Sequence, residues 1–280
     1  MKKRKIGNTA VSLLLAVCFL TACGAQTAPS PAASPSESAA SPEQAEEVPE
    51  ITESAESAES AESGENPIGV DWSAFQSTMT PEEWDGLSLY LPVLEESTAF
   101  HWINGTELTE DAPYHRTSEG VQTETVTLAE FHKARWAWNG EAPEKLVLNR
   151  LAVQDVDGDG VPELALLFEE LGWYYLVFHQ EGETFYAVEF PIRWFEDLRQ
   201  NGVYLGSGGA GDSTYYQMTF RGGRFEQAEL AHRVEWANGC TCTLAGETVT
   251  EADFDAWLAE TMVDGVTWYG PDGTALPENQ

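Results

Sequence analysis

Apolar side chains are spaced in two different ways along this chain, and the spacing predicts helices and strands after about Ile68. Apolar positions three or four residues apart are typical of a helix, whereas short apolar runs bounded by Gly, Asn or Asp are typical of strands. Strand-like runs dominate the region after residue 145. They are Leu146–Gln154, Leu164–Phe168, Tyr174–Phe178, Phe185–Phe190, Tyr215–Phe220, Phe225–Leu230, His232–Trp236 and Cys240–Leu244.

Three helices are predicted from their first turns, where a threonine precedes an acidic residue by three positions. In Thr80-Pro81-Glu82-Glu83 the proline also occupies the first helical position, where its missing N–H is not needed. Pro92 is expected to kink or end that helix. The predicted helices span 81–94, 128 to about 138 and 251–262, and a further short helix is predicted over 193–200, closed at Gly202.

The order of these elements is helix, strands, helix, which predicts an α+β domain. We expect an antiparallel sheet, arranged as a meander, with a few short helices packed on it. Gly222-Gly223 and Asn238-Gly239 separate neighbouring strands and are typical of hairpin turns. Only Cys240 and Cys242 fall in this region, so the domain has no disulfide framework and must be held by its core. One globular domain is therefore expected over 67–280.

The first 22 residues are typical of a secretory signal, with Lys2, Lys3, Arg4 and Lys5 followed by a short apolar stretch. That stretch is too short for a membrane span, which needs about 20 apolar residues. The following Leu20-Thr21-Ala22-Cys23 resembles the lipobox of bacterial lipoproteins. The resemblance implies cleavage before Cys23 and a lipid anchor on its thiol. The alternative is an ordinary secretory signal that contains a cysteine by chance.

Residues 23–66 follow the signal and are rich in Ala, Ser, Pro and Glu, with no Lys or Arg. Such a segment buries too little apolar surface to offset its chain entropy, so we expect a disordered acidic tether. The chain as a whole carries a net charge of −33. That charge repels nucleic acid and anionic lipid headgroups, so no nucleic-acid partner is expected.

The most informative motif lies between two predicted strands. Aspartates occupy positions 1, 3 and 5 of a nine-residue loop, glycine occupies position 6 and glutamate position 9. Hard oxygen ligands at this spacing can surround one Ca²⁺ ion, with the backbone carbonyl of position 7 as a further ligand. The expected ligands are Asp155, Asp157, Asp159, Val161 and Glu163. The alternative is a solvated turn, rich in aspartate, that binds calcium weakly.

Position 12 of this loop is Leu166, where a complete EF-hand would place a glutamate, and the flanking segments are strand-like. The loop instead resembles the strand–loop–strand calcium loops of FG-GAP and VCBS-type repeats. The wider order, from Leu151 through the loop to Phe178 and on to Ser207-Gly-Gly-Ala-Gly-Asp212, resembles a family of uncharacterised secreted lipoproteins of Firmicutes. This resemblance implies an extracytoplasmic location and a calcium site, but no reaction.

Other candidate sites are weaker. Two strand residues place the Cα atoms of Cys240 and Cys242 about 6.6 Å apart, near the upper limit for a disulfide, so a bridge needs a local kink. Free thiols are favoured over a bridge, and a bridge over a redox role. The five histidines are scattered and lack the spacing of a zinc site. The 207–212 segment lacks the Lys of a phosphate-binding loop, so a tight loop is expected there.

Three functions remain open from the sequence. The favoured one is a membrane-anchored, extracytoplasmic lipoprotein with a structural calcium loop, which serves as a non-catalytic adhesion or scaffolding domain. Its partners would be the membrane, through the lipid, and a cell-wall glycan or a surface protein. The alternatives are a glycan- or solute-binding lipoprotein, recognisable by an exposed aromatic cleft, and a cell-wall hydrolase, recognisable by a deep pocket with catalytic side chains. No oligomeric state is indicated.

Overall fold

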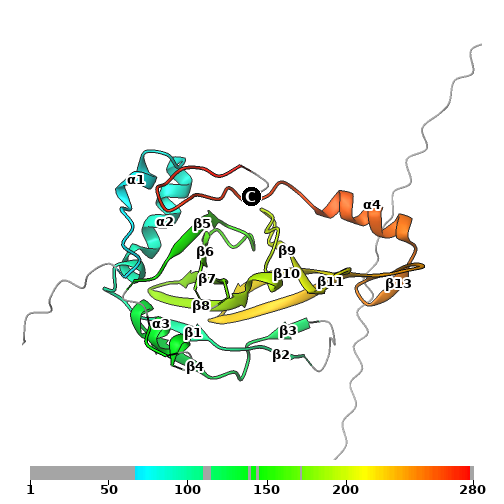
Figure 1. Cartoon of the computed structure of the whole chain (residues 1–280), viewed down its shortest axis with the longest axis horizontal. Coiled ribbons are helices and arrows are strands. Elements are labelled where there is room, and N and C mark those ends of the chain that lie inside the picture. Colours follow the sequence, from blue (N-terminus) through cyan, green and yellow to red (C-terminus); the bar gives the residue numbers. More distant parts are fainter. Residues whose placement is uncertain (1–66, 110–114, 138–139, 143–144, 171, 278–280) are drawn as a thin grey trace, which may run out of the picture. The chain divides into compact units, whose positions relative to one another are not determined.

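The structure is a computed structural model that describes residues 67–109, 115–137, 140–142, 145–170 and 172–277. The chain divides into two compact units, and every described residue belongs to the second, Ala58–Gln280. The expected signal peptide, the lipidation of Cys23 and the acidic tether of 23–66 lie outside the described residues. The described part is an α+β domain with largely antiparallel sheets and short helices, which confirms the predicted fold class (Figure 1).

The first sheet has six strands in the order β4-β1-β8-β7-β6-β5. Strands β5 to β8 form the predicted meander, in which each strand pairs antiparallel with the next one in the sequence. Strand β1 departs from this pattern because it runs parallel to β8. The bounds are β1 (Phe100–Ile103), β4 (Thr123–Val126), β5 (Leu148–Gln154), β6 (Glu163–Phe168), β7 (Tyr174–Glu181) and β8 (Thr184–Pro191).

The second sheet is a meander in the order β13-β12-β11-β10-β9, with the short strands β2 and β3 added beside β11. Strand β11 is long enough to pair with β3 near its beginning and with β12 near its end. The bounds are β2 (Glu107–Leu108), β3 (His115–Thr117), β9 (Val203–Gly209), β10 (Asp212–Arg221), β11 (Arg224–Trp236), β12 (Gly239–Leu244) and β13 (Glu247–Val249).

The first sheet is the middle layer of the domain, as β6 illustrates. All of its residues are buried, and successive side chains of a strand point to opposite faces. Leu164 and Leu166 pack in a cluster with residues from α1 (Ser73–Gln76), α2 (Pro81–Leu94) and α3 (Leu128–Trp136). Ala165 and Leu167 pack in a second cluster with Met218 of the other sheet. The helices therefore cover one face of this sheet, and the second sheet covers the other.

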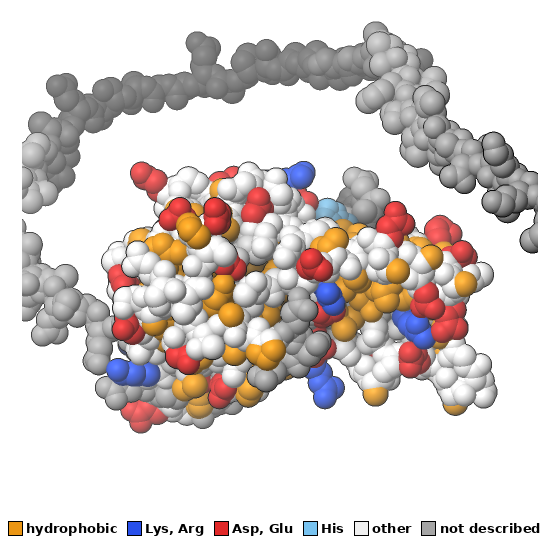
Figure 2. Space-filling view, turned by 90° about the horizontal axis from the view of Figure 1, so that it is seen from above, with side chains coloured by type: hydrophobic (Ala, Val, Ile, Leu, Met, Phe, Trp, Pro, Cys, Tyr) orange, Lys and Arg blue, Asp and Glu red, His pale blue; other side chains and the backbone are white. Residues whose placement is uncertain are grey.

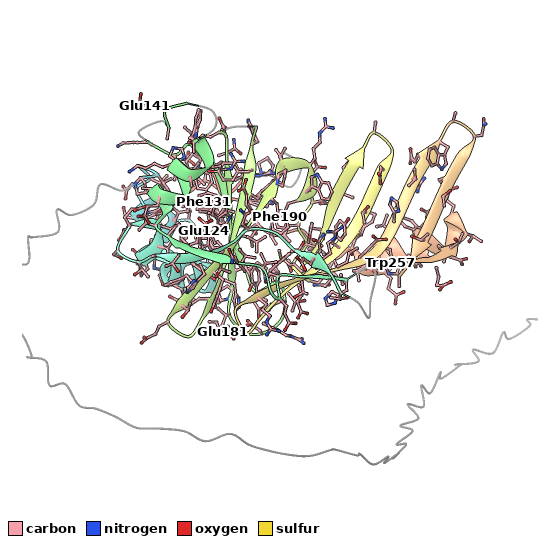
Figure 3. All side chains as sticks on the ribbon, turned by 90° about the horizontal axis from the view of Figure 1, so that it is seen from below. Glu124, Phe131, Glu141, Glu181, Phe190 and Trp257 are labelled. Atoms are coloured by element: carbon pink, nitrogen blue, oxygen red, sulfur yellow. The ribbon has the colours of Figure 1, made fainter. Side chains whose placement is uncertain are left out.

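A third, smaller cluster lies where α4 (Glu251–Thr261) packs on β12. Phe254 and Trp257 of α4 contribute to it. Figure 3 shows Trp257 on this extension of the second sheet, apart from Phe131 and Phe190, which belong to the two main clusters. None of the described helices is both long and apolar enough to cross a membrane.

The predicted helix starts at Thr80, Thr127 and Thr250 are confirmed. Thr80 and Thr127 each form a reciprocal capping box with the glutamate three residues later, and Thr250 accepts a hydrogen bond from the amide of Asp253. Pro92 lies inside the last turn of α2. The helix predicted to run to about residue 138 instead ends at Trp136.

The helix predicted over 193–200 is wrong. Only a 3₁₀ turn forms there, at Ile192–Trp194, and the chain then extends, so that Glu196 bridges Leu205 of β9. The reason is tertiary, because Phe195 and Leu198 are both buried between the two sheets and the extended chain satisfies its backbone by pairing. The strands predicted over 225–230 and 232–236 are one strand, β11, with a register shift opposite Tyr215 and Tyr216.

Gly86 sets how closely α2 approaches the sheet. A Cβ atom there would come within 2.7 Å of Val153 Cγ1 and 2.8 Å of Pro162 Cγ. Gly86→Ala improves helix propensity by about 1 kcal/mol, but overpacking costs about 1–3 kcal/mol. We expect a net loss of up to about 2 kcal/mol in the free energy of unfolding, measured by urea denaturation. Gly209→Ala, where a Cβ meets nothing within 4 Å, is the control and should be nearly neutral; a stabilised Gly86→Ala would contradict this packing.

Candidate metal centre

The aspartate-rich loop connects β5 to β6, and the pair Gln154–Glu163 is the last rung of that hairpin. Gly158 and Gly160 adopt φ values of 79° and 90°. These values lie in the left-handed region, which glycine enters without a steric penalty and other residues avoid. The two glycines therefore let the chain fold back tightly enough to turn the aspartates of the loop toward its own backbone.

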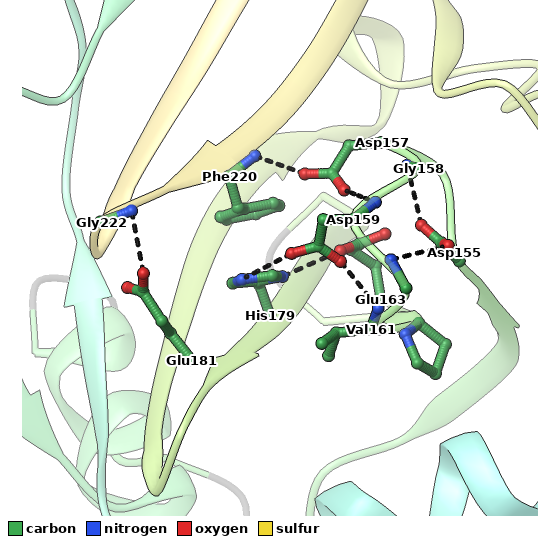
Figure 4. Close-up of polar contacts among 12 residues, drawn as sticks. Asp155, Asp157, Gly158, Asp159, Val161, Glu163, His179, Glu181, Phe220 and Gly222 are labelled. Atoms are coloured by element: carbon green, nitrogen blue, oxygen red, sulfur yellow. Dashed lines mark hydrogen bonds and ion pairs between the residues drawn. The ribbon is translucent and has the colours of Figure 1, made fainter.

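Backbone amides of the loop donate to its own carboxylates (Figure 4). Asp155 accepts from Gly158 through Oδ1 at 2.8 Å and from Gly160 through Oδ2 at 3.0 Å. Asp159 Oδ1 accepts from the amide of Val161 at 2.7 Å. A carboxylate has about four lone-pair positions, so these bonds hold the side chains in place and leave acceptor capacity for a cation.

Asp157 connects the loop to the second sheet. Its Oδ1 accepts from the amide of Asp159 at 3.2 Å, and its Oδ2 accepts from the amide of Phe220, in β10, at 2.8 Å. The sequence separation between Asp157 and Phe220 is 63 residues. The same carboxylate therefore shapes the loop and joins the two sheets.

Glu163 occupies the ninth loop position, but it is the first residue of β6 and is only 3% exposed. Its Oε2 accepts from the amide of Val156 at 2.9 Å, and its Oε1 lies 2.9 Å from Nδ1 of His179. Burial raises the pKa of this carboxyl to about 7, although the hydrogen bonds from His179 and Val156 oppose the rise. Glu163 thus depends on its two partners for its charge.

His179 belongs to the candidate site but could not be singled out from the spacing of the histidines in the sequence. Its ring is buried, stacks on Phe220 with centroids 4.9 Å apart, and places Nε2 3.8 Å from Asp159 Oδ2. Burial alone would lower the pKa of His179, but the hydrogen bond and charge of Glu163, together with Asp159 and Asp157, raise it. The register of the β6–β7 hairpin could have revealed it, because the pair Leu164–Phe178 extends by one step to Glu163 and His179.

The expected ligands form two overlapping groups instead of one set. Asp155, Asp157 and Asp159 can each offer an oxygen within 4.8 Å of the others, and Asp159, Glu163 and His179 form a second such group. Both groups could hold a metal ion. The first offers only oxygen, which suits Ca²⁺ or Mg²⁺, whereas the imidazole of the second suits a transition metal. Val161, whose carbonyl oxygen was the expected ligand, contacts the site through its amide, which donates to Asp159.

Two neighbouring elements hold the loop from outside. The hydroxyl of Tyr90, in α2, donates to the carbonyl oxygen of Pro162 at 2.6 Å. Gly202, which precedes β9, approaches so closely that a Cβ atom there would lie 2.5 Å from the carbonyl oxygen of Val156. The loop is therefore fixed by α2 on one side and by the second sheet on the other.

A cleft of about 270 Å³ opens beside the loop. Its lining includes Asp157, Asp159, His179, Glu181 and Arg221. The amide of Gly222, at the β10–β11 turn, donates to Oε1 of Glu181 at 3.1 Å and links the far edge of the cleft to β7. Asp157, Asp159 and His179, which belong to the two candidate groups, thus line a polar opening.

The other candidates from the sequence are the 207–212 segment, the remaining histidines and the two cysteines. The 207–212 segment is the β9–β10 hairpin, so a tight connection is confirmed, although Ser207 and its next two residues belong to β9. His232 lies 2.8 Å from Asp212, and His132 lies 3.0 Å from Glu170. Cys240 and Cys242 are both free thiols.

Comparisons of the chain with protein-family models, with curated proteins and with solved structures find no match. The resemblance of the loop region to secreted lipoproteins stays a prediction.

The Glu163–His179 pair should matter for stability. His179→Ala would leave a buried carboxyl with one donor, and an unsatisfied buried polar group costs about 1–3 kcal/mol. We expect the free energy of unfolding, measured in chelator by urea denaturation, to fall by about 2–4 kcal/mol once lost packing is included. His115→Ala is a matched control because its pair with Glu226 is part-exposed, at 3.5 Å, and should cost at most about 1 kcal/mol. Equal losses in the two variants would show that the buried pair has no special role.

Proposed function

We propose that this chain is a lipid-anchored, extracytoplasmic lipoprotein whose domain is stabilised by Ca²⁺ at the 155–163 loop. The observation that carries the calcium site is the group of three aspartates, whose carboxylate oxygens lie within 4.8 Å of one another. Like charges so close together repel each other strongly. A bound dication removes that repulsion, which links its binding to the folded state of the loop.

Calcium is preferred because the first group offers only oxygen atoms. Among the described residues, no Lys or Arg forms an ion pair with Asp155, Asp157 or Asp159. His179 faces Asp159 at 3.8 Å and carries a charge only when it is protonated. The carbonyl of Val161 would add a backbone oxygen, whereas the two oxygens of Glu163 already accept from Val156 and face His179, respectively. Ca²⁺ accepts six to eight such ligands in flexible geometry, whereas Mg²⁺ demands a near-octahedral set.

The role of the ion would be structural. The loop contacts α2 through Pro162 and β10 through Asp157, so an ion there stabilises the junction of a helix with both sheets. The remaining function would be non-catalytic binding or scaffolding at the cell surface. Figure 2 shows that acidic side chains greatly outnumber basic ones on the face drawn, in keeping with the net charge of −33, which disfavours anionic polymers as partners.

A second candidate function is solute binding, and the cleft beside the loop favours it. Arg221 and the loop carboxylates line the same opening, so a small ligand with an anionic group could contact both the guanidinium and a loop-bound cation. Calorimetric titration of the calcium-loaded chain with small carboxylates and with cell-wall oligosaccharides separates the two functions. Heat that disappears in Arg221→Ala would favour solute binding over a purely structural site.

Calcium should raise the thermal stability of the chain. A dissociation constant in the range of about 10⁻⁴–10⁻³ M and 10 mM Ca²⁺ give about 1.5–3 kcal/mol of stabilisation. For a domain of this size, that is a rise of about 3–10 °C in Tm. The shift should be much smaller with Mg²⁺ and absent in Asp157→Ala/Asp159→Ala. It is measured by differential scanning calorimetry, with and without metal, for each variant.

Asp272→Ala is the matched control, because Asp272 Oδ1 also accepts from a nearby amide, that of Thr274 at 2.9 Å, but outside the loop. Its calcium shift should equal that of the parent chain. If the double variant does not fold, Asp159→Asn replaces it. Stabilisation by Zn²⁺ but not by Ca²⁺ would assign the metal to the group that contains His179 instead, and no shift with any metal would reduce the loop to a turn.

The lipid anchor is tested separately through Cys23. We expect Cys23→Ser to release the chain from the membrane fraction of a bacterial host, because a single thiol carries the proposed lipid. Cys18→Ser, five residues before Cys23 and inside the apolar stretch, should leave the chain with the membrane. Fractionation followed by immunoblotting measures both. Release of both variants, or of neither, would be incompatible with lipidation at Cys23.

A further inference from the structure

The two remaining cysteines meet on one face of β12. Cys240 and Cys242 are two positions apart, so their side chains point to the same side of the strand. Their Sγ atoms lie only 3.6 Å apart, and both thiols are free. The sequence indicates that a bridge needs a kink because the Cα atoms are nearly too far apart. The two side chains turn toward each other, so that the sulfurs are already in contact although the Cα atoms are not drawn together.

The surroundings make the two thiols unequal. Cys242 is 2% exposed and belongs to the small cluster with Ala231 and Phe254, whereas Cys240 packs at its edge and is half-buried. Burial, together with its hydrogen bond to Cys240 and the charge there, raises the pKa of the Cys242 thiol to about 11. Arg233 lies opposite Cys242 in the neighbouring strand and partly opposes that rise. Cys240 is therefore the thiol that an external reagent reaches first.

We propose that Cys240 and Cys242 form a reversible dithiol–disulfide couple that exchanges with an external disulfide, such as that of a small thiol or a thiol oxidoreductase. The Cys240 thiolate attacks one sulfur of the external disulfide, which forms a mixed disulfide and releases one thiolate. The Cys242 thiolate then attacks Sγ of Cys240 and displaces the second. In total, two protein thiols are oxidised, one external disulfide is reduced to two thiols, and the two protons leave with those thiols.

The geometry favours a labile bond over a permanent one. A disulfide needs its sulfurs about 2.05 Å apart, so they must approach by about 1.5 Å from their present contact. The two residues lie in the middle of a strand that pairs on both sides, with β11 and β13, which resists a change in the backbone. A strained disulfide is reduced more readily than a relaxed one, so both states should be reachable near the potential of common cellular thiols.

The sequence offers a clean test in the full chain. Residues 234–280 contain no Lys or Arg, so trypsin releases one peptide after Arg233 that carries both cysteines and neither Cys18 nor Cys23. The folded chain is equilibrated at several ratios of reduced to oxidised glutathione and quenched with acid. Free thiols are alkylated, and the tryptic peptide is weighed by mass spectrometry. The expected product is the unalkylated peptide, about two hydrogen masses lighter, in a fraction that rises with oxidised glutathione.

Two variants test the order of attack. In Cys242→Ser, a mixed disulfide with glutathione should accumulate on Cys240. In Cys240→Ser, the buried Cys242 should react with oxidised glutathione at least about tenfold more slowly than Cys240 does. The urea midpoint of each variant is measured to show that it is folded. Unfolding the parent chain in urea should lower the equilibrium yield of the internal disulfide about tenfold or more, because the thiols lose their orientation.

Four outcomes would overturn the proposal. The peptide could remain fully alkylated at every glutathione ratio, it could carry two glutathiones, or it could be cross-linked to another peptide. An equal yield of internal disulfide in the folded and unfolded chain would also count against it, since the fold would then contribute nothing. The test involves neither the calcium loop nor the lipid anchor, so its result is independent of the proposed function.

Discussion

Burial of both faces of the six-stranded sheet is the constraint on which the rest of the domain depends. A strand such as β6 sends alternate side chains into two different apolar clusters, so polar groups have no place along it except at its ends. Glu163 begins β6, and His179 lies beside it near the end of β7. Because a buried carboxyl is costly without partners, this end of the sheet must supply donors, and it does so through His179 and the amide of Val156.

Local interactions explain which parts of the fold the sequence predicts. The helix starts at Thr80 and Thr127 depend on contacts within four residues, and the meander of β5 to β8 on alternating apolar runs and short turns. Strand β1 could not be predicted in the same way, because it is only four residues long and lies between β4 and β8, and its partner in β8 comes more than eighty residues later. The segment after Arg193 illustrates the opposite error, since burial of Phe195 and Leu198 overrides a plausible helical pattern.

The candidate site also combines local interactions, which the sequence predicts, with long-range ones, which it does not. The aspartates and glycines of the loop lie within nine residues and interact mainly with each other, so spacing alone indicated them. His179 and Phe220 join the site only through the register of β7 and the approach of β10. These two residues also change which ligands a metal ion would find. They commit Glu163 to a buried partner and divide the expected single ligand set into an oxygen-only group and a mixed group that share Asp159.

Sharing of Asp159 has a consequence for how metal binding would act on the domain. A cation among the three aspartates would draw on the same carboxylate that faces His179, and His179 stacks on Phe220, whose amide binds Asp157. The loop, β7 and β10 are thus each in contact with the other two. Strengthening one member constrains the others, because each contact uses a group already fixed by the next. In a chain with so large an excess of acidic groups, a dication at this junction would relieve charge repulsion at the place where the two sheets meet.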